Sequence, residues 1–164
     1  MKKFYEEYPN NEPIKSSDYI DSTKMSIASI NEIVYTEESK TFLGTSNITN
    51  GVGIILTNGN NEYALGHFTS DYELSIYSML NKISLQKPFK IQVIPGSNMS
   101  LTGFDAIITF LLNKNNVTLY DFEVEVLNLK HFANESGGID IAIDTETSTL
   151  LKPDYQNLIS SRRS

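Results

Sequence analysis

Short runs of hydrophobic residues, separated by turn-forming residues, set the pattern of the chain from Met25 onwards. Several runs alternate apolar and polar positions with a period of two, which is typical of strands that bury one face. The Asn58-Gly59 pair stands between two such runs and predicts a hairpin, because a tight hairpin turn needs residues that accept a positive φ. The predicted strands cover residues 27–35, 41–43, 51–56, 62–68, 89–94, 117–120, 122–127, 139–143 and 150–151.

Two segments carry the spacing of a helix. The first begins at Ser70, which together with Glu73 fits a capping box, and its apolar positions are Tyr72, Ile76, Met79, Leu80 and Ile83. The second begins near Thr102 and has an apolar stripe at positions 104, 107, 108, 111 and 112. The order of the elements predicts an α+β fold with a β-sheet or sandwich core and two main helices packed on one side.

Composition divides the chain into three parts. Residues 1–24 are polar and contain Pro9 and Pro13, so we expect an N-terminal arm there. Residues 25–152 carry the periodic pattern and are predicted to form one domain, because a chain of 164 residues suits a single hydrophobic core. Residues 153–164 are polar and are predicted to form a C-terminal tail.

Charge and composition exclude several classes of function. A net charge of −7, from 13 Lys and Arg against 20 Asp and Glu, argues against a nucleic-acid partner, because backbone phosphates need clustered cations. No apolar run approaches the roughly 20 residues that span a bilayer, and no Sec-type signal peptide is visible. The absence of cysteine excludes disulfides, thiolate metal sites and a thiol nucleophile, and two histidines argue against zinc. We therefore expect no membrane span, metal or cofactor.

Ser46 and His67 are the candidates for chemistry. Hydrolysis of an amide needs a nucleophile, a base within hydrogen-bond reach and donors for the oxyanion. Ser46 follows an apolar strand end in a Gly-Thr-Ser turn, and His67 lies in an apolar strand after the hairpin. If the strands around both residues are neighbours, both side chains lie at one end of the sheet. The plainer interpretation is that Ser46 is a turn residue and His67 a core histidine.

Four segments resemble the CheD-like protein-glutamine deamidases. Residues 43–46 (Leu-Gly-Thr-Ser) are similar to the family's Leu-Gly-Ser/Thr-Cys motif, and residues 64–68 resemble the apolar segment that carries its catalytic histidine. Residues 94–99 (Ile-Pro-Gly-Ser-Asn-Met) resemble a Gly-rich segment before a helix. Gly137-Gly138 and residues 144–151 resemble the closing Gly-Gly and hairpin of the family. The four segments occur in the family's order and span residues 30–152.

The resemblance implies a role for each of these residues. In the family, a cysteine thiolate attacks the side-chain amide of a protein glutamine, and a histidine takes the thiol proton and later protonates the ammonia. Ser46 occupies the nucleophile position and His67 the base position, and Gly44, Thr45 and Asn47 are the expected backbone oxyanion donors. The family's orienting threonine corresponds to Lys40, so the neighbouring Thr41 is the candidate for that role.

Serine at position 46 leaves alternatives open, because its hydroxyl has a far higher pKa than a thiol. The leading hypothesis is a protein-glutamine deamidase of CheD or toxin-effector type in an inactive Cys-to-Ser form, either introduced or natural. The first alternative is a catalytically silent binding module, and the second is a serine amidase or esterase. The implied partner is a protein bearing the target Gln. The implied location is the bacterial cytoplasm, or a host cell reached through a signal that the sequence does not display.

Overall fold

The computed structural model describes residues 2–7, 20–83, 89–100, 102, 105–107, 109 and 122–155. Within these ranges the chain forms strands, the α-helix α1, two short 3-10 helices and further helical residues between 102 and 109. The strands are β1 (Lys2–Glu7), β2 (Met25–Ala28), β3 (Ile33–Tyr35), β4 (Phe42–Ile48), β5 (Val52–Thr57), β6 (Tyr63–Phe68), β7 (Phe89–Pro95), β8 (Phe122–Asn128), β9 (Ile139–Asp144) and β10 (Thr149–Leu151). The helices are η1 (Ser22–Lys24), α1 (Tyr72–Lys82) and η2 (Lys130–Phe132).

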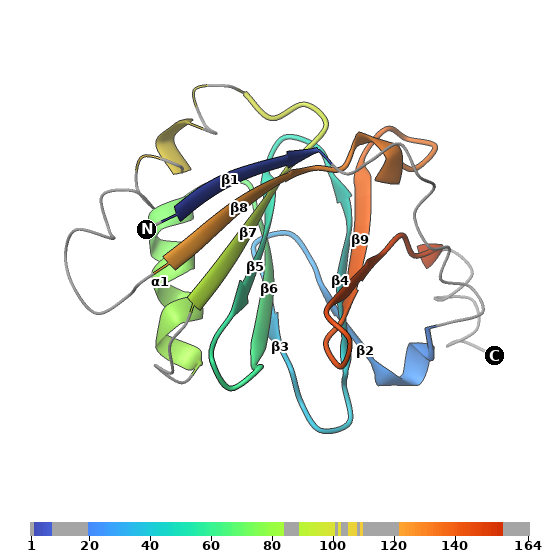
Figure 1. Cartoon of the computed structure of the whole chain (residues 1–164). Coiled ribbons are helices and arrows are strands. Elements are labelled where there is room, and N and C mark those ends of the chain that lie inside the picture. The colour runs from blue at the N-terminus through green and yellow to red at the C-terminus, as the bar shows by residue number, and fades with distance from the viewer. Residues whose placement is uncertain are drawn as a thin grey trace.

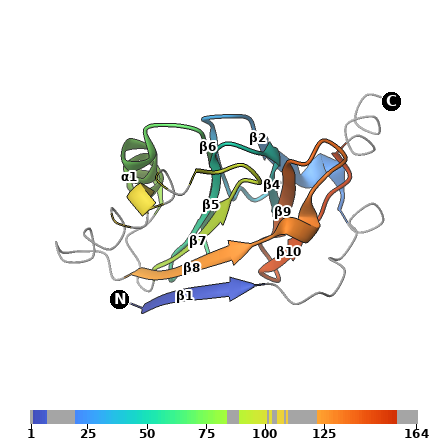
Figure 2. The ribbon, with the colours of Figure 1, turned by 90° about the horizontal axis from the view of Figure 1, so that it is seen from above.

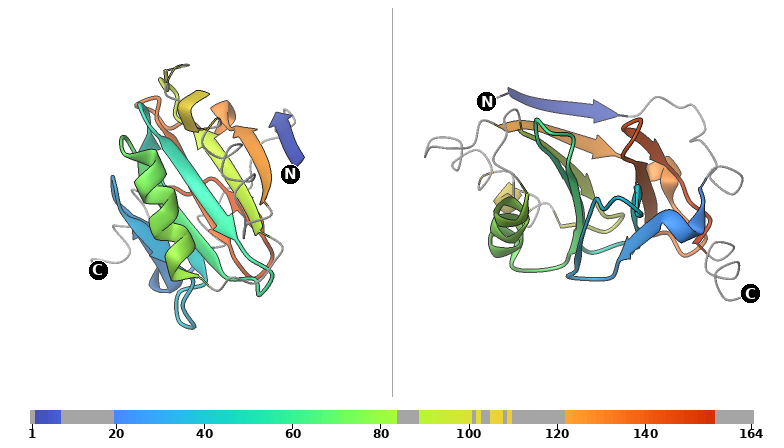
Figure 3. Two further views of the ribbon diagram at one scale, coloured as in Figure 1. Left: turned by 90° about the vertical axis from the view of Figure 1, so that its left-hand side faces the viewer. Right: turned by 90° about the horizontal axis from the view of Figure 1, so that it is seen from below.

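Two β-sheets face each other, and α1 covers the outer face of the larger one (Figure 1). The six-stranded sheet has the order β1-β8-β7-β5-β6-β3, and the four-stranded sheet has the order β10-β9-β4-β2. Both sheets mix parallel and antiparallel pairs; β8 is parallel to β7 and β1, while β5 is antiparallel to β6 and β7. Figure 3 shows α1 lying across the larger sheet on the side away from the smaller one. The fold is α+β, as the sequence predicted.

Hydrophobic side chains form three layers. The strands of the larger sheet contribute to two of them, because successive residues of a strand face opposite sides. Ile54 packs towards α1, whereas its neighbour Ile55 packs between the two sheets. The layer under α1 includes Ile76, Met79, Phe89 and Ile107; the layer between the sheets includes Leu43, Leu65, Leu127 and Ile141; the third, on the outer face of the smaller sheet, includes Met25, Phe42, Ala142 and Tyr155.

Several predicted elements are confirmed. β5 and β6 pair antiparallel from Val52↔Phe68 to Thr57↔Tyr63, so the Asn58-Gly59 hairpin forms. The predicted strands at 89–94, 122–127, 139–143 and 150–151 correspond to β7, β8, β9 and β10. Thr102, residues 105–107 and Thr109 are helical, and Ile107 packs in the same layer as α1. The rest of the predicted second helix, the strand at 117–120 and the tail beyond 155 lie outside the described residues.

Three sequence predictions are wrong in detail. The strand predicted over 27–35 is split into β2 and β3, which belong to different sheets, by a turn in which Asn31 has a φ of 63°. The capping box does not form, because Asp71 is the N-cap and makes no side-chain cap hydrogen bond from its left-handed backbone. Residues Lys2–Glu7 of the predicted arm form β1. Within the described residues, no helix combines the length and the apolar character that crossing a bilayer requires.

Candidate functional site

His67 lies near the end of β6, and its side chain points between the two sheets. Its Nδ1 is 3.0 Å from Oγ1 of Thr45 on β4, the strand that faces it from the smaller sheet. Both residues are buried, with exposed fractions of 2% for His67 and 0% for Thr45. The strands that contain residues 41–45 and 62–68 therefore belong to different sheets. The sequence analysis had required them to be neighbours in one sheet for a shared site. They meet across the space between the two sheets.

The hydrogen bonds of Thr45 define which nitrogen of His67 carries the proton. The Thr45 hydroxyl donates to the carbonyl oxygen of Ala28 at 2.8 Å. A hydroxyl has one hydrogen, so this same oxygen accepts the hydrogen bond from Nδ1–H of His67. Nε2 is then the basic nitrogen of a neutral ring. Burial lowers the pKa of His67, because the apolar surroundings disfavour the charged imidazolium.

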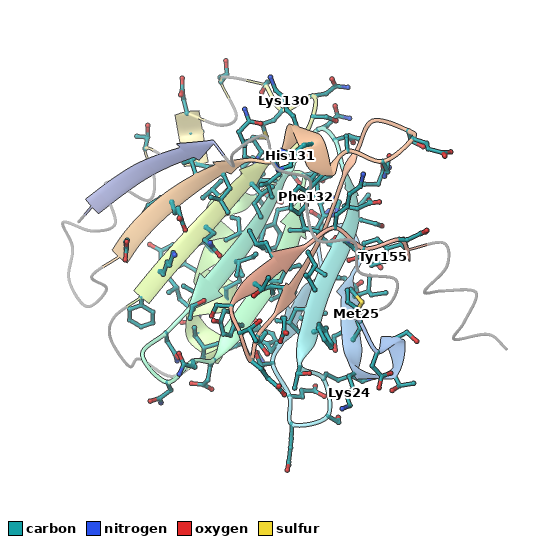
Figure 4. All side chains as sticks on the ribbon, turned by 45° about the vertical axis from the view of Figure 1, so that its right-hand side comes forward. Lys24, Met25, Lys130, His131, Phe132 and Tyr155 are labelled. Atoms are coloured by element: carbon teal, nitrogen blue, oxygen red, sulfur yellow. The ribbon has the colours of Figure 1, made fainter. Side chains whose placement is uncertain are left out.

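The hydroxyl that His67 contacts belongs to Thr45, and in the described part of the chain no hydrogen bond joins Ser46 to His67. A β-carbon on Gly44 would meet the Tyr155 hydroxyl and the Met25 side chain, so Gly44 faces the outer side of the smaller sheet. Figure 4 labels Met25 and Tyr155 beside that sheet. Regular alternation would place Ser46 on the outer side as well, but the register of β4 with β9 shifts between Thr45 and Ile48, so the alternation is interrupted at Ser46. The structure brings His67 together with Thr45 by a hydrogen bond and not with Ser46.

The predicted oxyanion donors already serve other partners. Gly44 and Thr45 lie in the part of β4 that pairs with both β2 and β9, so their backbone groups belong to the sheet. The Asn47 amide donates to Oδ1 of Asp140 at 2.8 Å, and Asn134 Nδ2 donates to the same oxygen at 2.9 Å. Burial raises the pKa of Asp140, while these two hydrogen bonds oppose the shift. The group is a satisfied polar network rather than an open anion site.

Thr45, not Thr41, orients His67. The Thr41 carbonyl accepts hydrogen bonds from the backbone and the hydroxyl of Thr145, at 3.0 and 2.7 Å. The sequence did contain a signal for the role of Thr45. Leu43 and Thr45 are two residues apart and share the inward face of β4, and a polar side chain on a buried face needs a hydrogen-bond partner.

Three of the segments that carry the family resemblance, and Gly137-Gly138 of the fourth, meet at one end of the two sheets. Residues 144–151 of the fourth segment lie at the other end, where the Ser148 hydroxyl is hydrogen-bonded to the Tyr63 hydroxyl beside the β5–β6 hairpin. The amide of Gly96 donates to the Gly51 carbonyl at 2.8 Å, and that of Asn98 donates to the Thr49 carbonyl at 2.8 Å. A β-carbon on Gly96 would collide with these same backbone oxygens. A β-carbon on Gly138 would collide with Asn47. The Thr45–His67 hydrogen bond joins the remaining two segments at this end, which we call the motif end.

Two surface hollows lie elsewhere. One of about 420 Å³ is lined by Asp71, Tyr72, Leu74, Tyr77, Ala106 and Ile107. The other, of about 340 Å³, lies beside the β5–β6 hairpin and is lined in part by Tyr63, Lys90 and Ser148. Neither hollow is lined by Ser46 or His67. In the part of the chain that the structure describes, no group of three or more His, Cys, Asp or Glu side chains is arranged to hold a metal ion.

Comparisons with known proteins do not assign the chain to a family. No protein-family model matches it, and no curated protein does. Function is therefore inferred from the site itself. The observations used are the buried hydrogen bond between His67 and Thr45 and the convergence of segments at the motif end.

Proposed function

We propose that the chain is a CheD-like domain that is catalytically silent and acts by binding a protein. The observation that carries this proposal is the state of His67. Its Nδ1 is engaged by Thr45, its side chain is buried, and no hydrogen bond among the described residues joins it to Ser46. The fold keeps a histidine in the family's position but holds it as a structural residue.

The convergence of three segments and part of the fourth supports the CheD-like assignment. Segments 43–46, 64–68 and 94–99 and the Gly137-Gly138 pair are far apart in the sequence, yet they meet at the motif end. Residues 144–151 of the fourth segment lie at the opposite end. Segments that form one site are expected to converge in this way, whereas chance matches in sequence have no reason to do so. The α+β architecture with two facing sheets agrees with this assignment.

Two chemical facts support the absence of turnover. A general base must lie within hydrogen-bond reach of the proton that it removes, and among the described residues the hydroxyl bonded to His67 is that of Thr45 and not that of Ser46. A serine hydroxyl also ionises at a much higher pH than a cysteine thiol, whose ordinary pKa is about 8.5. A site built for a thiolate therefore gains no nucleophile from serine at this position.

The exposed side chains at the motif end suit a polar protein segment. Asn47 and Asn98 are exposed, and Asn134 is half-buried beside Asn47. A primary amide donates and accepts hydrogen bonds at once, so it is complementary to another primary amide. We therefore propose that the bound segment presents a glutamine, the side chain that the resemblance implies as substrate.

A paired measurement of chemistry and binding tests the proposal. The native chain and the Ser46→Cys variant are incubated with candidate target proteins, and peptide mass spectrometry detects conversion of Gln to Glu. We expect no conversion with either chain, because Nδ1 of His67 is engaged by Thr45 and no hydrogen bond in the described part of the chain joins residue 46 to the ring. Conversion by the native chain would contradict the silent domain outright.

Binding is tested by blocking the motif end. Ser97→Trp adds bulk at an exposed position there, and Asn60→Trp adds the same bulk on the exposed β5–β6 hairpin. Pull-down of the target should be lost with Ser97→Trp and retained with both Asn60→Trp and Ser46→Cys. Retention by Ser97→Trp would show that the motif end is not the binding surface.

The second candidate is a glutamine deamidase with serine in place of its nucleophile, and the same convergence of segments favours it. Asn47 has a φ of 58°, and the register of β4 with β9 shifts between Thr45 and Ile48. The strand is therefore irregular next to Ser46, where a change in the direction of that side chain would begin. Conversion of Gln by Ser46→Cys alone would favour the deamidase over the silent domain.

A further inference from the structure

β1 forms an edge of the larger sheet. It is the first strand in the order β1-β8-β7-β5-β6-β3, and it pairs in parallel with β8 from Lys2↔Glu123 to Glu7↔Asn128 (Figure 2). Among the strands that the structure describes, β8 alone pairs with β1, so within this part of the chain the second side of β1 presents backbone N–H and C=O groups outward. Such an edge is a template for another strand.

The sequence of β1 has its charges sorted along the strand. It runs Lys-Lys-Phe-Tyr-Glu-Glu, with cations at one end, aromatic residues in the middle and anions at the other end. Opposite charges across a strand pair stabilise it, and like charges directly opposite destabilise it. A parallel pair of two such strands would put Lys beside Lys and Glu beside Glu. An antiparallel pair puts the Lys end of each strand beside the Glu end of the other.

We propose that β1 pairs antiparallel with β1 of a second copy of this chain, which joins two larger sheets into one continuous sheet across a two-fold axis. Homo-oligomers are most often two-fold dimers with a self-complementary interface. A two-fold axis through an antiparallel pair passes between a residue and its own copy, here Phe4 or Tyr5. With Phe4 opposite Phe4 of the second copy, Lys2 lies opposite Glu6. With Tyr5 opposite Tyr5 of the second copy, Lys3 lies opposite Glu7.

The length of the strand limits the alternatives. Pro9 follows β1 by two residues in the sequence and has no N–H to donate, so it opposes extension of the pairing. A strand of six residues then loses a large share of its pairs in any register other than these two. Both registers keep opposite charges together, so the charge pattern selects the antiparallel dimer whichever residue lies on the axis.

Charge reversal provides the test. The molar mass in solution is measured by light scattering and sedimentation for the native chain, for Lys2→Glu with Lys3→Glu, and for Glu6→Lys with Glu7→Lys. The native chain should have twice the monomer mass. Each variant alone should have the monomer mass, because its β1 carries one sign of charge. An equimolar mixture of the two variants should again give twice the monomer mass, because their strands are complementary.

The control reverses charges away from β1. Lys24 and Glu38 are exposed next to β2 and β3, and β3 is the opposite edge of the larger sheet from β1, so Lys24→Glu with Glu38→Lys should leave the dimer mass unchanged. Circular dichroism checks that every variant keeps the native fold. A native chain of monomer mass at all concentrations overturns the proposal. A dimer that persists in either β1 variant, or a mixture that stays monomeric, overturns it as well.

Discussion

The hydrogen bond between Thr45 and His67 fixes which atom donates and which accepts in each side chain. The Thr45 hydroxyl donates to Ala28 and accepts from His67, so both of its roles are filled. The imidazole is buried and neutral, with its proton on Nδ1. This histidine links the two sheets through a buried hydrogen bond. The same residue type at the same place in the sequence would have been equally compatible with a catalytic base.

Replacing Thr45 with valine should destabilise the protein by about 1–3 kcal/mol, because Nδ1–H of His67 and the Ala28 carbonyl lose their buried partner. Thr45→Ser is the matched control: it keeps the hydroxyl and loses one methyl group, which costs about 1 kcal/mol. Chemical denaturation measures both changes. Histidine ¹⁵N shifts should report the Nδ1–H form in the native chain and in Thr45→Ser. The same pure form in Thr45→Val would contradict the assigned role of Thr45.

The stability of the protein should fall as the pH drops below about 6.5. Burial lowers the pKa of folded His67 from its ordinary value of 6.5, so below that pH the unfolded chain binds a proton that the folded chain does not. As the pH falls from about 6.5, the free energy of unfolding decreases until the pH reaches the folded-state pKa of His67. Above about pH 6.5 the free energy of unfolding does not depend on this group. Urea denaturation over a pH series measures the slope.

Two variants separate the groups that contribute to that slope. His67→Gln should remove the loss of stability below pH 6.5. Asp140 acts in the opposite direction, because burial raises its folded pKa above 3.8 and its contribution falls as the pH rises through that window. Asp140→Asn removes this second dependence. An unchanged slope in His67→Gln would show that other groups control the pH dependence.

At the scale of an element, the end of β7 lies in close contact with the backbone that connects β4 and β5. The Gly96 amide bonds to the Gly51 carbonyl, and the backbone oxygens of Thr49 and Gly51 occupy the space where a side chain would begin. Backbone atoms cannot rotate away as a long side chain can. The approach therefore requires glycine, and it ties β7 to the connection between β4 and β5.

Gly96→Ala should destabilise the protein by about 1–3 kcal/mol, the usual cost of forcing extra atoms into a packed site. Ser97→Ala changes the adjacent exposed residue and should alter stability by no more than about 0.5 kcal/mol. Thermal and chemical denaturation of both variants measure the difference. Equal stabilities for the two variants would mean that the segments at the motif end are not in the close contact described.

At the scale of the whole molecule, local patterns predicted elements well and their assembly poorly. Alternation along β8 and β9, and the Asn58-Gly59 turn, were sufficient for these strands and the hairpin, because both signals are local. The division of the strands between two sheets depends on packing between distant residues. The positive φ of Asn31, which sends β2 and β3 to different sheets, has no strong local signal beyond the tolerance of asparagine for that conformation.

The candidate site shows the same limit. Composition and motif order selected Ser46, His67 and the segments that meet at the motif end. The direction of each side chain depends on strand register and on the irregularity at Asn47, and these follow from the pairing of β4 with β9. The sequence therefore selected β4 and β6 as the strands that carry the candidate residues, and the structure shows Thr45 rather than Ser46 hydrogen-bonded to His67.

The parallel pairing of β1 with β8 has a consequence for synthesis of the chain. Roughly 120 residues separate Lys2 from its partner Glu123, so the ribosome makes β8 on the order of ten seconds after β1. During that interval β1 lacks β8, the strand with which it pairs in the folded sheet. Two nascent chains on one messenger RNA are close together in the same interval. Their first strands can meet before either chain has produced the strand that will hold β1 in place.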